Sequence, residues 1–169
     1  MTAARLGVVA LLAVAPSCGY HSTASAALPG DVRSIRVVPP DPSYTLEPQL
    51  PTMLAAELVR QLARAGVHAS TAGRAEASLS GKLLALTTVD APLDPSGRRV
   101  GARQLRLALE LYLAAADGRT LWRSGRLEVE TSSPIAATTT PSETTRVAAL
   151  QAIAVRAAAQ AVELLTSGL

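Results

Sequence analysis

The sequence predicts an α+β protein, a two-layer sandwich with two helices packed on one face of a four-stranded mixed sheet. One segment in the second half of the chain alternates leucine with polar residues, which is the period of a half-buried strand. Two other segments, one early and one at the end, repeat apolar residues at helical spacing. The elements follow one another as β-α-β-β-β-α, so both amphipathic helices can cover the same face of the sheet.

The N-terminal residues are typical of an exported lipoprotein. Arg5 precedes an apolar run over residues 6–15, which is too short for a membrane span of about 20 residues and fits a signal peptide. The sequence Ala15-Pro16-Ser17-Cys18 that follows resembles a lipobox, in which small residues precede a cysteine. Cys18 is the only cysteine, which excludes disulfides and zinc sites of the CxxC type. We therefore predict a signal peptide over residues 1–17 and a lipid on Cys18; the alternative is ordinary signal cleavage beside an incidental cysteine.

The expected lipid defines the location that we predict for the chain. In the lipoprotein pathway the cysteine sulfur becomes a thioether to diacylglycerol, and the amine freed by cleavage is usually acylated, for instance with palmitate. Several acyl chains together form a stable anchor, whereas one chain alone is marginal. Gly19 follows the cysteine, which resembles the default for outer-membrane sorting in Gram-negative bacteria. We expect residues 18–30 to be the lipidated N-terminus and tether, and residues 31–169 to be one α+β domain in the periplasm.

The first strand and helix are predicted from apolar spacing and from residues that end each element. Residues 33–38 resemble a short strand that two following prolines end. A helix is expected over residues 51–65, with Gly66 directly after its end. One side of this helix repeats leucine every four residues, at Leu50, Leu54, Leu58 and Leu62. We expect this side to pack in the core and the other to face solvent, with Glu57, Arg60 and Arg64.

The second half of the chain predicts three strands and a long helix. Residues 75–86 form a strand that Gly81 weakens, and residues 87–102 form a long connection. Residues 103–115 are the clearest strand, with five leucines on one face, and residues 120–131 are its hairpin partner. A polar loop then leads to a helix over about 143–166, with Ser142 as a plausible N-cap and Gly168 after its end.

The register of the hairpin depends on the length of its turn. A two-residue turn would pair Leu113 with Trp122 and would turn the leucines and valine of the second strand away from the leucine face. A three-residue turn with Gly118 in the left-handed conformation pairs Leu113 with Leu121 and keeps both apolar faces together. We select the three-residue turn, because it also produces favourable cross-strand pairs on the opposite face.

The selected register predicts a partner surface on the face away from the leucines. It sets Tyr112 beside Trp122 and Arg106 opposite Glu128, with Arg126 nearby. Aromatic residues and arginine are enriched at binding hot spots, and a soluble monomer has little reason to expose its only tryptophan. The candidate contacts for a partner or for lipopolysaccharide are Arg106, Tyr112, Trp122 and Arg126. The alternative is that the chain covers this face itself, for example with residues 87–102.

The basic residues are concentrated in the same region, although the formal charge of the whole chain is only +3. Between positions 98 and 126 there are seven arginines and two acids, Glu110 and Asp117. An ordinary charged sheet surface explains this about as well as a site for an anionic partner. Nucleic acid is not expected as the partner of an exported lipoprotein. Phosphorylated lipid A or an acidic barrel wall fits better, because arginine binds phosphate bidentately.

Several segments, taken in order, resemble the LPS-assembly lipoprotein family (LptE). They are Cys18-Gly19-Tyr20-His21, residues 28–37 (LPGDVRSIRV), Leu46-Glu47-Pro48, Ala75-Glu76-Ala77 and residues 117–122 (DGRTLW). The resemblance implies two helices on a mixed four-stranded sheet. It also implies a lipoprotein that plugs the outer-membrane β-barrel LptD, assists assembly of that barrel, and binds lipopolysaccharide on its way to the cell surface.

Enzymatic chemistry is not expected from this sequence. His21 and His68 are far apart and belong to no metal-binding or triad-like pattern. Glycine-rich phosphate loops are also missing, so we predict no cofactor, no metal and no catalytic residue. The alternative function is that of a pilotin-like or regulatory lipoprotein of another envelope machine. A hydrolase on an unfamiliar scaffold is disfavoured, because no nucleophile and base are arranged together.

Overall fold

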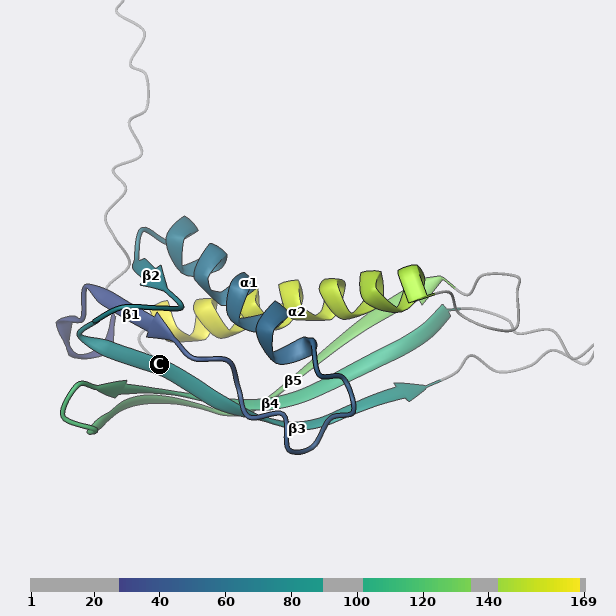
Figure 1. Ribbon diagram of the computed structural model, residues 1–169, viewed down its shortest axis with the longest axis horizontal. Coiled ribbons are helices and arrows are strands. Elements are labelled where there is room, and N and C mark those ends of the chain that lie inside the picture. The colour runs from purple at the N-terminus through teal and green to yellow at the C-terminus, as the bar shows by residue number, and fades with distance from the viewer. Residues whose placement is uncertain (1–27, 90–101, 135–142, 168–169) are drawn as a thin grey trace, which may run out of the picture.

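A single sheet with both helices on one of its faces forms the two layers of the protein (Figure 1). The computed structural model describes residues 28–89, 102–134 and 143–167. The predicted signal peptide, Cys18, Ser142 and Gly168 lie outside the described residues. The elements, in chain order, are η1 (Pro29–Asp31), β1 (Ser34–Val37), α1 (Leu50–Arg64), β2 (His68–Ser70), β3 (Ala77–Val89), β4 (Ala102–Ala115), β5 (Thr120–Pro134) and α2 (Glu143–Thr166).

The sheet confirms the predicted two-layer α+β class but corrects the number and order of its strands. Five strands lie in the order β2-β1-β3-β4-β5, with β1 parallel to β2 and β3, and the other pairs antiparallel. The element order is therefore β-α-β-β-β-β-α rather than β-α-β-β-β-α. The strand missed by the prediction, β2, has only three residues, which is too short for an alternating pattern to be recognised.

The end of α1 explains how the chain turns back to form β2. Gly66 has a φ of +77°, a conformation that a glycine adopts without steric cost. Its N–H donates to the carbonyl of Ala63 at 3.1 Å, and the N–H of Val67 donates to the carbonyl of Leu62 at 2.9 Å. This pair of bonds is the Schellman motif, so the predicted role of Gly66 is confirmed. Val67 is buried directly after it, and β2 begins at the next residue.

The predicted solvent side of α1 is wrong for one residue. Glu57 is only 4% exposed, and its carboxylate accepts hydrogen bonds from Arg60 on the same helix and from Gln151 of α2. Arg60 and Arg64 are exposed as expected. The helix α1 packs on α2 as well as on the sheet. Glu57 lies on the side that faces α2, and the leucine stripe in the sequence does not identify that side.

The core lies between the sheet and the two helices. All five predicted leucines of β4 are buried, at Leu105, Leu107, Leu109, Leu111 and Leu113. On the helix side of this core, α2 contributes buried alanines together with Leu150, Ile153 and Leu165. The length and composition of α2 would also suit a membrane span. Its buried stripe packs instead on α1 and β5, and the small alanine side chains allow close approach to the sheet.

The β4–β5 hairpin has the predicted three-residue turn but not the predicted register. Ala115 and Arg119 flank the turn, and Gly118 has a φ of +86°. The register then shifts twice, once between Leu113 and Ala114 and once between Glu110 and Tyr112. Each shift is a β-bulge, which adds one extra residue to β5. The second extra residue is Gly125, whose φ of +64° suits glycine.

These bulges correct the predicted placement of Trp122. Between the two bulges the pairing of β5 with β4 is shifted by one residue from the predicted register. The side chains of this part of β5 therefore point to the face opposite to the predicted one. Trp122 therefore pairs with Leu113, lies 9% exposed in the hydrophobic core, and is not beside Tyr112 on the outer face. Beyond the second bulge the two shifts add up to two residues, so Leu127 and Val129 return to the leucine face.

Candidate functional site

The face of the sheet that no helix covers carries rows of polar residues across three strands. Lys82 of β3, Glu110 of β4 and Arg126 of β5 form one row, by their register. In the next row Ser80, Tyr112 and Arg123 are aligned in the same way. Tyr112 is partly exposed and Arg126 is exposed. Two of the predicted contact residues therefore lie in adjacent rows of one accessible surface, which we call the open face.

Arg106 lies on the same open face, but its partner differs from the prediction. It was expected opposite Glu128; the double register shift places it opposite Glu130 instead, with Arg106 Nε 2.8 Å from Glu130 Oε1. Arg126 Nε forms a second ion pair, at 2.7 Å, with Glu128 Oε1 on its own strand. Both pairs are more than half exposed, so water and salt screen them strongly.

The charge of the open face is accordingly more balanced than the run of arginines in the sequence suggests. Among the described residues its bases are Arg36, Lys82, Arg106, Arg123 and Arg126, and its acids are Asp41, Glu110, Glu128 and Glu130. Arg98 and Arg99 lie outside the described residues. The excess of arginine in the sequence was counted over residues 98–126. Glu128 and Glu130, which offset part of this charge, come just after that range. The surface remains basic by a small margin.

A groove runs between the free edge of β5 and the exposed side of α2. Its volume is about 480 Å³, and charged or polar side chains line most of it, at Glu128, Glu130, Arg156, Gln160 and Glu163. Val129 and Ala159 complete the lining. The groove is therefore a polar channel beside a sheet edge rather than an enclosed apolar pocket of the kind that holds small-molecule ligands.

A second surface feature was not predicted from the sequence. In the loop between β1 and α1, Leu46 is 96% exposed and Tyr44 is 66% exposed, and both are among the largest apolar exposures in the described residues. The pattern that could have identified them is an apolar pair within a proline-rich segment, between Pro42 and Pro48.

The described part of the chain contains no cluster of three or more histidine, cysteine, aspartate or glutamate residues able to hold a metal ion. His68 is exposed on β2, at the edge of the sheet. His21 lies outside the described residues.

The comparisons with known proteins decide the family. The family described as LptE, lipopolysaccharide-assembly, matches residues 32–168 and thus most of the chain. The chain belongs to the LptE family. Membership of LptE implies a role as a membrane-associated, non-enzymatic lipoprotein in lipopolysaccharide assembly. The resemblance seen in the sequence is therefore confirmed.

Solved structures support the LptE fold at low sequence identity. A minor lipoprotein from Acinetobacter baumannii is 17% identical, with a TM-score of 0.52, over 80% of this chain and 92% of that protein. The protein XCC0632 from Xanthomonas campestris is 15% identical, with a TM-score of 0.53, over 84% of this chain and 89% of that protein. At such identities the likeness shows the shared fold alone. No curated protein matches this LptE chain significantly in sequence.

Proposed function

We propose that this chain is an outer-membrane lipoprotein that plugs an LptD-type barrel, assists its assembly and binds lipopolysaccharide during delivery to the outer leaflet. The observation that carries the proposal is the LptE family match over residues 32–168. A two-layer fold suits a plug, because one sheet face is left uncovered and polar while the helices complete the core on the other. A water-filled barrel interior is also polar, so the open face can lie against it without burying apolar groups.

The open face is the proposed contact surface for lipopolysaccharide or for the barrel wall. Arg106, Tyr112 and Arg126 are its proposed contact residues. Trp122 is left out, because its side chain is buried in the core. Arginine binds phosphate with paired hydrogen bonds, which makes the phosphates of lipid A suitable ligands for this surface. The ion pairs of these arginines with Glu130 and Glu128 are exposed and weak, so a phosphate group could displace the carboxylates.

Depletion of the protein tests the proposed function. Loss of the protein should lower both the amount of correctly folded LptD and the amount of lipopolysaccharide at the cell surface. Restoring the wild-type gene should recover both. Normal levels of both after depletion would contradict the proposal. If a secretin rather than LptD co-purifies with the protein, the pilotin-like function replaces it.

Attachment to the outer membrane through Cys18 is part of the same proposal. The lipobox-like sequence and the single cysteine support it. Cys18→Ala removes the sulfur that accepts diacylglycerol, so the variant should move to the soluble periplasmic fraction. Fractionation followed by a carbonate wash measures this change. If the variant stays firmly in the membrane fraction, Cys18 is not the anchor.

A further inference from the structure

The described chain begins at a point that is fixed to the sheet. Leu28 is only 5% exposed, and its carbonyl accepts a hydrogen bond from the N–H of Asp31 at 3.2 Å, across η1. Gly30 has a φ of +75° and lies so close to Leu121 of β5 that an added Cβ would meet the leucine side chain at 3.2 Å. The chain before Leu28 therefore leaves the domain from one defined place, beside the start of β5.

This place is close to the expected lipid along the chain. Ten residues, from Cys18 to Ala27, precede Leu28, and ten residues span at most about 35 Å when fully extended. The same end of the molecule includes η1, the starts of β1, β2 and β3, the last turn of α1 and the turn between β4 and β5 (Figure 1). We call it the tether end.

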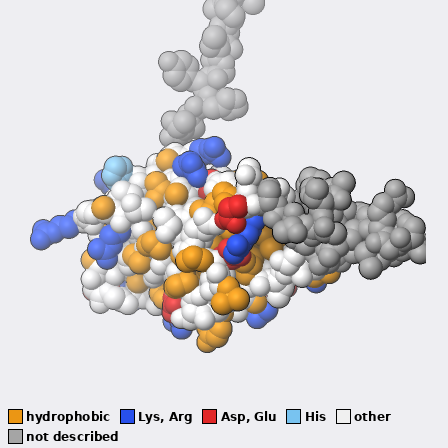
Figure 2. Space-filling view, turned by 45° about the vertical axis from the view of Figure 1, so that its right-hand side comes forward, with side chains coloured by type: hydrophobic (Ala, Val, Ile, Leu, Met, Phe, Trp, Pro, Cys, Tyr) orange, Lys and Arg blue, Asp and Glu red, His pale blue; other side chains and the backbone are white. Residues whose placement is uncertain are grey.

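Charge is distributed unevenly between the tether end and the rest of the described chain. The tether end carries six exposed arginines, Arg33, Arg36, Arg64, Arg74, Arg119 and Arg123. Its three acids, Asp31, Glu76 and Asp117, leave an excess of three positive charges. The other side chains that the structure describes include six bases and eight acids. In the space-filling view, blue side chains project from the left-hand end, whereas red and blue lie together towards the right (Figure 2).

Most of the tether-end arginines have no carboxylate partner among the described residues. The one ion pair printed by the geometry of this end joins Arg119 Nε to Asp117 Oδ2 at 3.9 Å, and both side chains are largely exposed. On the open face, Arg36 and Arg123 lie in the two rows nearest the tether end, and neither row contains an acid. Five guanidinium groups of the tether end are therefore available to an anionic partner.

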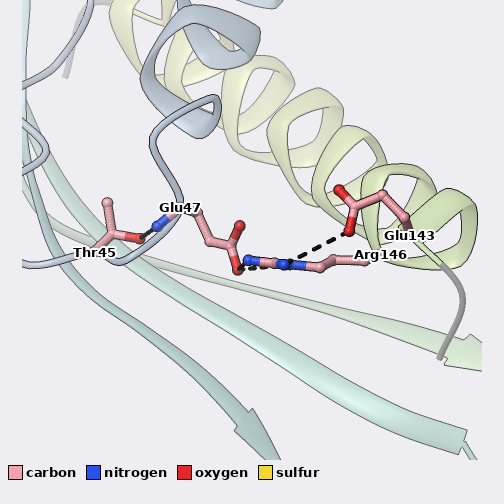
Figure 3. Close-up of polar contacts among 4 residues, drawn as sticks. All are labelled: Thr45, Glu47, Glu143 and Arg146. Carbon is pink, nitrogen blue, oxygen red and sulfur yellow. Dashed lines mark hydrogen bonds and ion pairs between the residues drawn. The ribbon is translucent and has the colours of Figure 1, made fainter. Parts of the chain in front are cut away.

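At the opposite end of the molecule, where α2 begins, the arginine is neutralised. Glu47 Oε1 accepts from Nε of Arg146 at 3.0 Å and from Nη2 at 2.7 Å (Figure 3). Arg146 Nη1 also lies 3.7 Å from Glu143 Oε2. The hydrogen bond to Glu47, and then the charge of Glu47, raise the pKa of this guanidinium above its ordinary value. Free arginine is thus a property of the tether end and not of both ends.

An anionic membrane surface matches the tether end in both charge and position. Basic side chains near such a surface each contribute to binding, and the attraction decays within a Debye length of about 8 Å at physiological salt. The proposed lipid on Cys18 keeps the tether end near that surface. Arginine also binds phosphate groups with paired hydrogen bonds, so the phosphates of phospholipid headgroups are suitable ligands.

We propose that the tether end docks, through its unpaired arginines, on anionic phospholipid headgroups of the leaflet that holds the Cys18 lipid. This inference rests on the proposed function for the anchor alone, and it concerns the lipoprotein before it enters a barrel. It assigns phospholipid to the tether end, whereas Arg106, Tyr112 and Arg126 are proposed for lipopolysaccharide. Docking in this orientation leaves the end where α2 begins accessible to a partner.

Co-sedimentation of the full chain carrying Cys18→Ala with vesicles tests the docking, because this variant lacks its own lipid. It should bind vesicles of phosphatidylglycerol mixed with phosphatidylcholine at low salt, and high salt should release it. In this background Arg33→Glu combined with Arg119→Glu should weaken binding at least about tenfold. Arg33→Lys combined with Arg119→Lys keeps the charge and should bind nearly as well as the parent. The matched control, Lys82→Glu combined with Arg156→Glu, changes the net charge equally at exposed positions outside the tether end and should bind more tightly than the tether-end reversal.

Each other outcome overturns the docking. Absence of binding to phosphatidylglycerol vesicles at low salt would mean that the tether end does not take phospholipid. Equal weakening by the two charge reversals, with unchanged unfolding midpoints by circular dichroism, would mean that net charge alone determines binding. If binding requires lipopolysaccharide in the vesicles, or if the tether-end reversal lowers only capture of the barrel, the occupant is a different one. The anchor is tested separately, since the vesicle result does not depend on where Cys18→Ala fractionates in cells.

Discussion

Leu113 of β4 lies directly opposite Trp122 of β5, and both side chains belong to the core beneath the helices. Leu113 is fully buried and Trp122 is nearly so. This pair exists because one extra residue, Leu121, enters β5 after the turn and moves the following side chains to the other face. The only tryptophan of the chain is therefore a packing residue, and its role is stability rather than recognition.

Replacing Trp122 by alanine should destabilise the domain strongly. Removing a buried aromatic side chain leaves a cavity, and we expect the free energy of unfolding to fall by about 3–5 kcal/mol. Urea denaturation followed by circular dichroism measures the change. Tyr112→Ala is the control from the open face and should cost at most about 1 kcal/mol, the size of a cross-strand contact. Equal losses for the two variants would show that Trp122 is not part of the core.

The hairpin illustrates how much of the fold the sequence predicts. Leucine recurs at every second position of β4 from Leu105 to Leu113, so the buried face of this strand could be assigned correctly. The turn was also correct, because Gly118 supplies the left-handed conformation that a three-residue turn requires. The bulges could not be predicted from alternation alone, since one extra residue changes every assignment after it. Gly125 is the one sequence feature that marked the second bulge.

The other errors arise where tertiary contacts outweigh local pattern. β2 has three residues and exists because β1 offers it a parallel neighbour. Glu57 resembles a solvent residue in sequence but is buried where α1 meets α2. For the candidate site, the sequence identified Arg106, Tyr112 and Arg126 correctly as surface residues. It missed Leu46, because pattern analysis does not distinguish an exposed leucine in a loop from one that packs against the core.

The buried contact between Glu57 and Gln151 should contribute to the packing of the two helices. A hydrogen bond to a charged group contributes about 1.5–3 kcal/mol, and a buried group left without its partner loses stability. We expect Glu57→Ala and Gln151→Ala to destabilise the domain, and a double-mutant cycle to give a coupling free energy above about 1 kcal/mol. Glu163→Ala, at an exposed position of α2, is the control and should be nearly neutral. Additive losses from the first two variants would show that the contact contributes nothing.

Asp41 should make the stability of the domain depend on pH in the acid range. Hydrogen bonds from the side chain and then from the backbone N–H of Ser43 lower the pKa of Asp41 below its ordinary value, and the charge of Lys82 acts in the same direction. A lowered folded-state pKa adds stability above the unfolded-state pKa of about 4, and this stability is lost as the pH falls through the folded-state value. The stability advantage of wild type over Asp41→Asn should therefore shrink between about pH 5 and pH 2.

The same titration includes its own control. Ser43→Ala keeps the Asp41 carboxylate but removes the hydroxyl donor. The stability advantage of Ser43→Ala over the double variant Ser43→Ala with Asp41→Asn should therefore be smaller than that of wild type over Asp41→Asn. It should also disappear at a higher pH. Unfolding midpoints measured at intervals across this range provide the comparison. A constant difference between wild type and Asp41→Asn at every pH would mean that Asp41 has the same pKa in the folded and unfolded states.

The open face should bind anionic lipid through charge rather than through the buried tryptophan. Arg126→Glu combined with Tyr112→Ala places a third acid near Glu110 and Glu128 and removes the adjacent aromatic ring. We expect capture of lipopolysaccharide to weaken at least about tenfold without loss of the fold, since both positions are outside the core. Arg74→Glu in an exposed loop changes the net charge equally and controls for long-range attraction. The difference between the two variants should shrink at high salt, because exposed charges are screened. If the double variant and Arg74→Glu capture lipopolysaccharide equally, the open face is not the lipopolysaccharide site. The net positive charge of the chain would then explain the binding.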